Sequence, residues 1–142
     1  MDVQQSNTSL NISGKKQIRD LQLAFNSVYP FLRIEFYKEQ PGLKAGHKKY
    51  LEGSSSLTAA GLTNAGNMLI SDSMTVSQLE NQLKDNFGLK AHAFRKSGTM
   101  WLEITMTGNW SLKHQNQHGQ ELCEPIKTEL LKDREEQDNS LE

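Results

Sequence analysis

The sequence predicts an α+β fold, a two-layer sandwich in which a mostly antiparallel sheet carries its helices on one face. In two segments the apolar residues have the spacing of an amphipathic helix, and each of these segments is followed by one in which apolar and polar residues alternate as in a strand. The second helix–strand pair is followed by the pattern of a β-hairpin. A chain of 142 residues fits one domain, since domains usually span roughly 100 to 200 residues. Only 35% of the residues are hydrophobic, which indicates that part of the chain stays outside the core.

Two terminal segments and one internal segment account for that low apolar fraction. Residues 1–12 are mostly polar, and we expect a disordered lead-in. Residues 13–119 form the predicted domain, with a long mobile loop over 39–66 in which the pattern permits a short strand at 48–51. Residues 120–142 read as an acidic, partly helical tail.

The first helix is predicted over about 15–29, with Ser13 as its N-cap. Its apolar stripe consists of Ile18, Leu21, Phe25 and Val28. Pro30 ends this helix, because the residue before a proline avoids the helical conformation. A strand follows over 31–38.

The second helix has the clearest local signal in the chain. A short strand over 68–71 precedes it, and Thr75 and Gln78 have the spacing of a capping box. Met74 and Leu79 stand where a hydrophobic staple would place them, and Gly88 marks the C-terminal end.

Strand and hairpin signals dominate the segment after Gly88. Strands over 89–96 and 99–107 flank a turn at Ser97-Gly98. A short helix then runs to about Gln117 with Gly119 as its stop, and a last helix spans about 126–136.

Shifting the chain by 58 residues reveals a possible internal repeat. The shift places Ile18, Leu21, Phe25, Tyr29, Phe31, Phe36 and Lys38 on Val76, Leu79, Leu83, Phe87, Leu89, Phe94 and Lys96. Any two amphipathic helix–strand units share such spacing, so coincidence stays open beside duplication. A duplicated αββ unit would resemble a permuted ferredoxin-like fold.

Strand alternation separates the residues of the sheet into two faces. The predicted inner face comprises Leu32, Ile34, Phe36, Leu89, Ala91, Ala93, Met100, Leu102, Ile104 and Met106. The outward residues include our six candidate binding residues, Arg33, Tyr37, Lys90, Phe94, Lys96 and Trp101. One conflict remains, because the 58-residue shift aligns outward Phe94 with inward Phe36, and a one-residue slip reverses every side chain.

Aromatic residues interleaved with cations suit three arrangements. They form interfaces with a protein partner or a second copy, they stack nucleic-acid bases, or the rest of the chain covers them as a second core. The leading hypothesis is a non-enzymatic protein-interaction or self-association module. The alternative is a single-stranded nucleic-acid-binding protein.

Enzymatic activity has no positive support in the sequence, and we predict no catalytic, cofactor-binding or metal-binding residue. His114 and His118 have helical i, i+4 spacing near Cys123, but no second ligand cluster accompanies them, and we interpret both as solvated. Cys123 lacks a cationic neighbour that would lower its pKa. Phosphate-loop and nucleophile-elbow motifs are absent.

The net charge of -1 hides an uneven distribution. Residues 15–119 hold 13 Lys+Arg and 8 Asp+Glu, whereas residues 120–142 hold 3 and 8. We expect that the acidic tail could screen the basic domain. No apolar stretch has the length of a membrane span, the first residues lack a secretory pattern, and the single cysteine favours the cytoplasm.

The second half of the chain resembles small uncharacterised bacterial proteins of the Bacteroidetes type. The stretches that carry this resemblance are Phe87-Gly88-Leu89, Phe94-Arg95-Lys96-Ser97-Gly98, Trp101-Leu102, Trp110-Ser111-Leu112 and Gln115-Asn116. The resemblance implies no activity and transfers no site residue.

Overall fold

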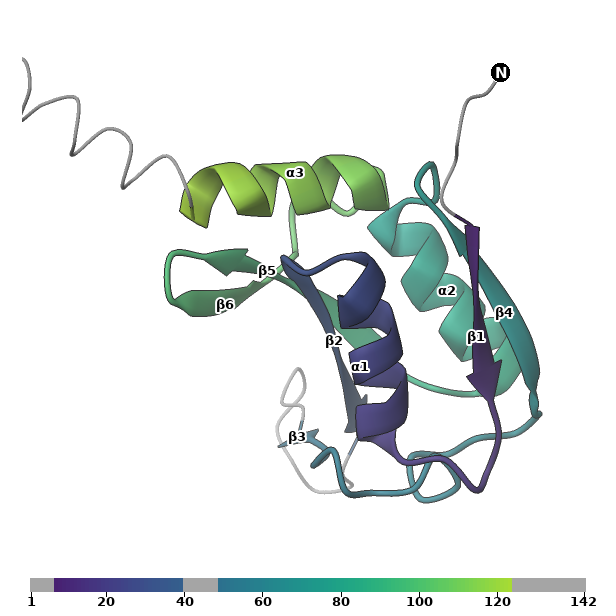
Figure 1. The fold of residues 1–142 in the computed structure, drawn as a ribbon. Coiled ribbons are helices and arrows are strands. Elements are labelled where there is room, and N and C mark those ends of the chain that lie inside the picture. Colours follow the sequence, from purple (N-terminus) through teal and green to yellow (C-terminus); the bar gives the residue numbers. More distant parts are fainter. Residues whose placement is uncertain (1–6, 40–48, 124–142) are drawn as a thin grey trace, which may run out of the picture.

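The computed structural model describes residues 7–39 and 49–123 and confirms the α+β class (Figure 1). Its elements are β1 (Asn7–Ile12), α1 (Ile18–Val28), β2 (Leu32–Lys38), β3 (Lys49–Tyr50), β4 (Gly66–Ser71), α2 (Val76–Phe87), β5 (Ala91–Ser97), β6 (Met100–Glu103) and α3 (Leu112–Cys123). The predicted helix over 126–136 lies outside the described residues.

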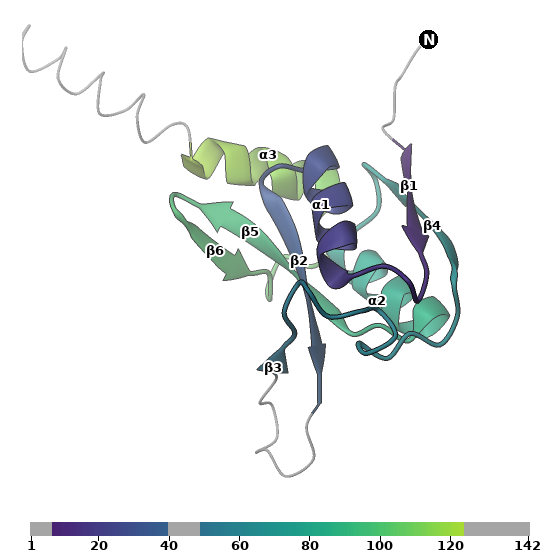
Figure 2. The ribbon, with the colours of Figure 1, turned by 60° about the horizontal axis from the view of Figure 1, so that its bottom comes forward.

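The strands form two antiparallel sheets. β1 pairs with β4, and the four-stranded sheet has the order β3-β2-β5-β6. Ile34 of β2 stands opposite Ala93 of β5, and Lys96 of β5 stands opposite Trp101 of β6. Figure 2 shows the β5–β6 hairpin on the side of the molecule away from β1 and β4.

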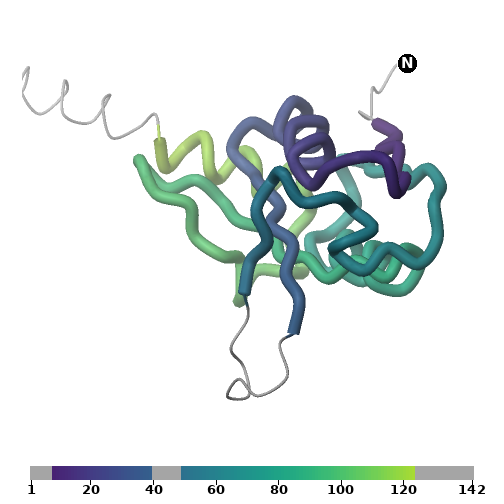
Figure 3. Tube along the Cα trace, turned by 90° about the horizontal axis from the view of Figure 1, so that it is seen from below, coloured from purple at the N-terminus to yellow at the C-terminus, as the bar shows by residue number. Residues whose placement is uncertain are grey.

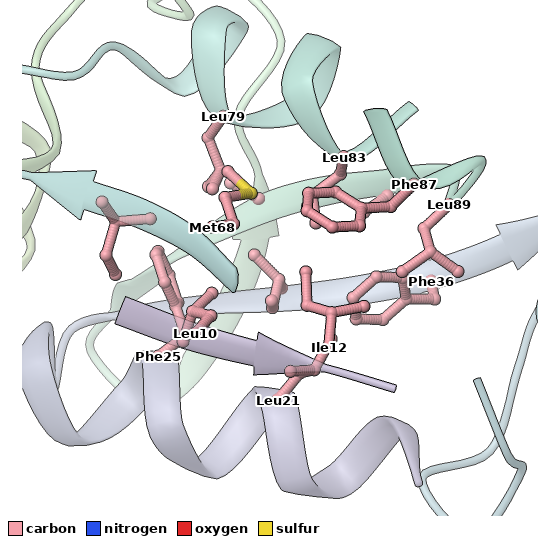
Figure 4. Close-up of a cluster of buried hydrophobic side chains, with 14 of the residues drawn as sticks. Leu10, Ile12, Leu21, Phe25, Phe36, Met68, Leu79, Leu83, Phe87 and Leu89 are labelled. Carbon is pink, nitrogen blue, oxygen red and sulfur yellow. The ribbon is translucent and has the colours of Figure 1, made fainter. Parts of the chain in front are cut away.

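One hydrophobic core joins both sheets to the helices (Figure 4). Helix α1 contributes Leu21 and Phe25, and helix α2 contributes Leu79 and Leu83. The inner face of the four-stranded sheet meets them with Leu32, Ile34, Phe36, Ala91 and Ala93, all buried. Burial of these apolar side chains is the main force that fixes the sheet against the helices.

The local signals around α2 are confirmed. The Thr75 side chain accepts from the Gln78 N–H at 3.1 Å, and the Gln78 side chain accepts from the Thr75 N–H at 2.9 Å. Gly88 ends the helix with φ of 74°, a left-handed conformation that favours glycine. A Cβ at this position would also meet Thr63 Cγ2 at 2.7 Å.

The conflict between the two strand registers has a simple geometric solution. Both face assignments hold, because inward Phe36 is buried whereas outward Phe94 lies half-buried on the opposite face. The helices begin 58 residues apart, but α2 has 12 residues and α1 has 11, so the strands that follow are offset by 59. An offset of 59 aligns inward Ile34 with inward Ala93 and removes the conflict. The duplication itself stays a prediction.

The disordered lead-in is wrong for residues 7–12, which form β1. Leu10 and Ile12 are buried in the core, and Leu10 stands opposite Met68 of β4. The short strand expected at 48–51 is confirmed by β3. The predicted long mobile loop is held against the domain after this strand. Leu57 is buried, and the carbonyls of Ser55 and Gly53 accept from the first backbone N–H groups of α1 at 2.8 and 2.9 Å.

Gly119 does not end α3, which continues to Cys123. A Cβ at Gly119 would lie 2.8 Å from Phe31 Cβ and 3.1 Å from Arg95 Cγ. Glycine therefore lets α3 approach β2 and β5 closely, and the sequence alone did not distinguish this packing role from a helix stop.

The predicted inward burial of Met100, Leu102 and Met106 is wrong, since all three side chains are exposed. Met100 and Leu102 do share the inner face with Ser97 and Arg95, their cross-strand partners. Helix α3 packs against β5 and β2, and this leaves the inner side of β6 uncovered within the described chain. Ile104 is the one predicted member of this strand that reaches the core.

The start of β1 and the end of α3 lie at opposite sides of the molecule (Figure 3). Within the described residues, no helix is long and apolar enough to cross a membrane.

Candidate functional site

The outer face of the four-stranded sheet, defined by the outward residues of β2, β3, β5 and β6, holds all six predicted site residues. Strand alternation and cross-strand pairing put them there, because opposite residues of antiparallel strands share a face. Arg33 stands opposite Phe94, and Lys96 opposite Trp101. Lys90 precedes β5, and its carbonyl accepts from the Tyr37 N–H at 3.0 Å. All six residues are partly exposed.

One aromatic cluster occupies the β3 side of the outer face. The ring of Tyr37 stacks on His92 with centroids 4.9 Å apart. Tyr50 meets Tyr37 at 6.0 Å and Phe94 at 5.6 Å, both in edge-on geometry. Such contacts are worth roughly 0.5–1.5 kcal/mol each beyond area burial, so these rings form a preorganised surface.

Trp101 forms a second, cationic centre on the outer face. The Arg33 Cζ and the Lys96 Nζ each lie 6.0 Å from the centroid of its ring. Cations within about 6 Å of an aromatic face are attracted by its quadrupole. Since Arg33 is also opposite Phe94, it connects the two centres.

Carboxylates accompany the cations on this face. Arg33 Nε lies 2.5 Å from Glu35 Oε2, and Lys90 Nζ lies 3.4 Å from Glu39 Oε2. Glu103 accepts a hydrogen bond from the Tyr50 hydroxyl at 2.6 Å. Burial, and then this bond, raise the pKa of Tyr50 above its usual range. The face therefore carries both signs of charge rather than a uniformly positive potential.

A cleft of about 450 Å³ opens between α1 and the outer face. Its lining residues are Arg19, Gln22, Leu23, Asn26, Arg33, Gly53 and Trp101. Leu23 is 66% exposed, and Arg19 has no carboxylate partner among the described residues. The volume lies within the roughly 300–1,000 Å³ of ordinary ligand pockets.

The partial pairing of β2 explains why the cleft is there. Strand β3 pairs only with Tyr37 and Lys38, so the first half of β2 has no strand on that side. Helix α1 takes this place, because the Asn26 amide donates to the Leu32 carbonyl and the Gln22 amide donates to the Ile34 carbonyl, both at 2.9 Å. The outer surface of α1 thus becomes a wall beside Arg33.

The two histidines with i, i+4 spacing lie on α3 beside Trp110. Both imidazoles pack on Trp110, with His114 stacked at 4.3 Å and His118 edge-on at 5.5 Å. His118 also lies 3.5 Å from Glu121, while Cys123 Sγ lies 3.6 Å from the Gly98 carbonyl oxygen. The described part of the chain contains no group of three potential metal ligands.

Sequence reasoning missed Tyr50 on the outer face and every cleft residue except Arg33 and Trp101. Tyr50 lies in a poorly patterned segment, and only its pairing with Tyr37 reveals its orientation. Arg19 and Leu23 sit on the polar side of an amphipathic helix, a position that is ordinarily solvated. Leu23, a large apolar residue on the polar side of the helix, was the sequence feature that could have indicated this site.

In comparisons with known proteins, no family model, no curated protein and no solved structure matches this chain.

Proposed function

We propose that this protein is a non-enzymatic interaction module that binds a protein partner through the outer face. The observation that carries the proposal is the cleft between α1 and Trp101, whose lining residue Arg33 stands opposite Phe94 of the aromatic cluster. Aromatic residues and arginine are enriched in protein interfaces, and a few such anchors supply most of the binding energy.

The cleft favours a partner segment with an acidic side chain beside a large apolar or aromatic one. Leu23 and Trp101 offer apolar contact, and the guanidinium groups of Arg19 and Arg33 line the same space. Arginine binds carboxylates with a planar, two-pronged geometry. An acidic residue near Arg19 would complete the pairing that the described chain leaves open.

The mixed charge of the outer face favours protein over single-stranded nucleic acid. Glu103 stands opposite Phe94 and Glu35 stands opposite His92, so carboxylates lie among the aromatic rings that would stack bases. Nucleic-acid affinity depends on phosphate neutralisation by unopposed cations, and Arg33 and Lys90 already face carboxylates. Carboxylates on the face instead suit a partner that also presents cations.

Selection of phage-displayed peptides on the immobilised full chain tests the proposal. We expect enriched peptides that pair Asp or Glu with an aromatic or large aliphatic residue. Their affinity should fall at least about tenfold in Trp101→Ala, the loss of an anchor worth more than about 1.4 kcal/mol. Arg19→Glu should weaken the same peptides.

Two matched variants serve as controls. Trp110→Ala removes a tryptophan that contacts His114 instead of the cleft, and Lys84→Glu reverses an exposed charge on α2. Both should bind the peptides like the wild type. Peptides with no shared pattern, or peptides that bind Trp101→Ala unchanged, would contradict the proposal. Tight binding of oligo(dT) or oligo(U) that competes with the peptides would replace it with the nucleic-acid alternative.

A further inference from the structure

Exposed apolar side chains gather on and just after strand β6. Among the described residues five large apolar side chains are exposed, and three of them lie within residues 100–106. Met100 is 62% exposed, Leu102 46% and Met106 92%. Contiguous exposed apolar residues mark interaction surfaces more often than isolated ones do.

The backbone of β6 also has an open edge. The Ile104 N–H donates to the Ala93 carbonyl at 2.9 Å, and hydrogen-bonded pairs alternate along an antiparallel ladder. Leu102 and Met100 therefore direct their backbone groups toward β5, while Trp101 and Glu103 direct theirs away from it. β6 is the last strand in the sheet order, so within the described chain no strand receives them.

Elsewhere in this sheet, side chains occupy the unpaired edges. Gln22 and Asn26 donate to carbonyls of β2, and Glu80 accepts from the Ala93 N–H at 2.9 Å. No such side-chain bond reaches the outer edge of β6 in the part of the chain that the structure describes. An edge strand that is both unpaired and apolar is a template for another strand.

We propose that β6 pairs antiparallel with β6 of a second copy and joins two sheets into one of eight strands. The two-fold axis passes between the two Leu102 residues. Trp101 then stands opposite Glu103 of the second copy, and Met100 stands opposite its Ile104. This register meets the hydrogen-bond pattern, because the residues that direct their backbone groups outward, Trp101 and Glu103, face each other across the axis.

Charge and burial favour a second copy as the occupant. Each Glu103 would lie across from Trp101 of the other copy, whose ring has Lys96 Nζ at 6.0 Å. The two-fold symmetry therefore brings a Glu103 carboxylate near a Lys96 ammonium group at two places. The two Leu102 side chains would cover each other on the inner side, next to Met100. A two-fold interface closes on itself and yields a dimer without further growth. The two proposals share Trp101, which lines the α1 cleft and belongs to β6. Their tests separate them, because Leu102 lies on the inner face of β6 and does not line the cleft.

Analytical ultracentrifugation of the full chain tests the association itself. We expect a dimer that dissociates on dilution and a monomeric Leu102→Lys variant, in which two ammonium groups would meet at the axis. Leu102 is already exposed, so this variant should remain folded and show a cooperative thermal unfolding transition. Leu69→Lys, at an exposed position of β4, should remain dimeric. A monomer at about 100 μM, or a dimeric Leu102→Lys, would overturn the proposal.

Cysteine cross-linking tests the register. In a Cys123→Ser background, Leu102→Cys places two thiols at a non-hydrogen-bonded pair with Cα atoms about 4.5 Å apart, within disulfide range. Mild oxidation should give a covalent dimer. Met100→Cys in the same background should not cross-link, because Met100 faces Ile104 of the second copy. Equal cross-linking of both variants, or none with Leu102→Cys, would refute this pairing.

Discussion

The carboxylate of Glu80 on α2 accepts a hydrogen bond at 2.9 Å from the backbone N–H of Ala93 on β5. The β5–β6 pairing ends at Phe94 and Glu103, and beyond it the Ile104 N–H reaches only the Ala93 carbonyl. Glu80 therefore supplies the acceptor for the Ala93 N–H. Ala93 is fully buried, and an unpaired N–H there would be costly. The same carboxylate lies 3.4 Å from His92 Nδ1 on the adjacent outward residue.

Replacing Glu80 separates its role as an acceptor from its charge. Glu80→Ala leaves the Ala93 N–H unpaired and should lower the free energy of unfolding by about 1–3 kcal/mol. Glu80→Gln keeps a carbonyl oxygen at the same reach and should lose much less. Urea denaturation measures both, with Asp85→Ala on an exposed part of α2 as the control. Equal losses for Ala and Gln would show that the hydrogen bond to Ala93 contributes nothing.

We expect the stability difference between the wild type and Glu80→Gln to depend on pH. Burial is the largest effect on Glu80 and raises its pKa above the ordinary 4.5, although the Ala93 bond opposes it. The folded state therefore takes up a proton before the unfolded state does as the pH falls. The unfolding free energy of the wild type should rise relative to Glu80→Gln between neutral pH and 4.5. A relative decrease over this range would contradict the burial of the charged form.

Gly119→Ala should destabilise the protein despite the better helix propensity of alanine. The new Cβ would meet Phe31 Cβ at 2.8 Å and the Phe31 carbonyl oxygen at 3.2 Å, atoms that cannot move without the backbone. Overpacking costs about 1–3 kcal/mol, whereas the propensity gain is about 1 kcal/mol. Thermal unfolding should show a lower midpoint than that of Gln117→Ala, an exposed control on the same helix. A raised midpoint would mean that α3 does not pack closely here.

All three tyrosines should resist ionisation. Burial is the largest cause that raises the pKa of Tyr29, Tyr37 and Tyr50, and hydrogen bonds to Asp72 and Glu103 add to it for Tyr29 and Tyr50. Unfolded tyrosine ionises near about pH 10, so stability is retained below that pH and lost as the pH rises further. The phenolate absorbance band should therefore appear together with unfolding. A full phenolate signal from the folded protein would contradict this.

Local signals were sufficient for much of the fold. Thr75, Gln78 and Gly88 define α2 through contacts within a few residues, and the strand over 31–38 and the hairpin turn next to Gly98 follow from similarly short patterns. Strand β1 was missed because its polar residues hide Leu10 and Ile12. The 58-residue shift would have placed these two on Met68 and Ile70, which are also buried.

Long-range placement accounts for the remaining errors. Alternation gave the correct face for Leu102 but could not tell that α3 covers β5 and leaves β6 open. Likewise, alternation assigned Arg33 and Trp101 to the outer face, whereas the cleft beside them depends on α1 filling the unpaired half of β2. Neither relation is encoded in any short segment.

Mapping the bound peptide by ¹⁵N NMR tests the central claim most directly. The two tryptophans give separate indole N–H signals, so Trp101 reports on the outer face while Trp110 serves as an internal control. On titration with the most strongly selected peptide, we predict shifts for the Trp101 indole, for Arg33 and Phe94, and for α1 near Leu23. Shifts confined to Trp110 or to β1 and β4, with an unchanged Trp101 indole signal, would contradict partner binding at the outer face.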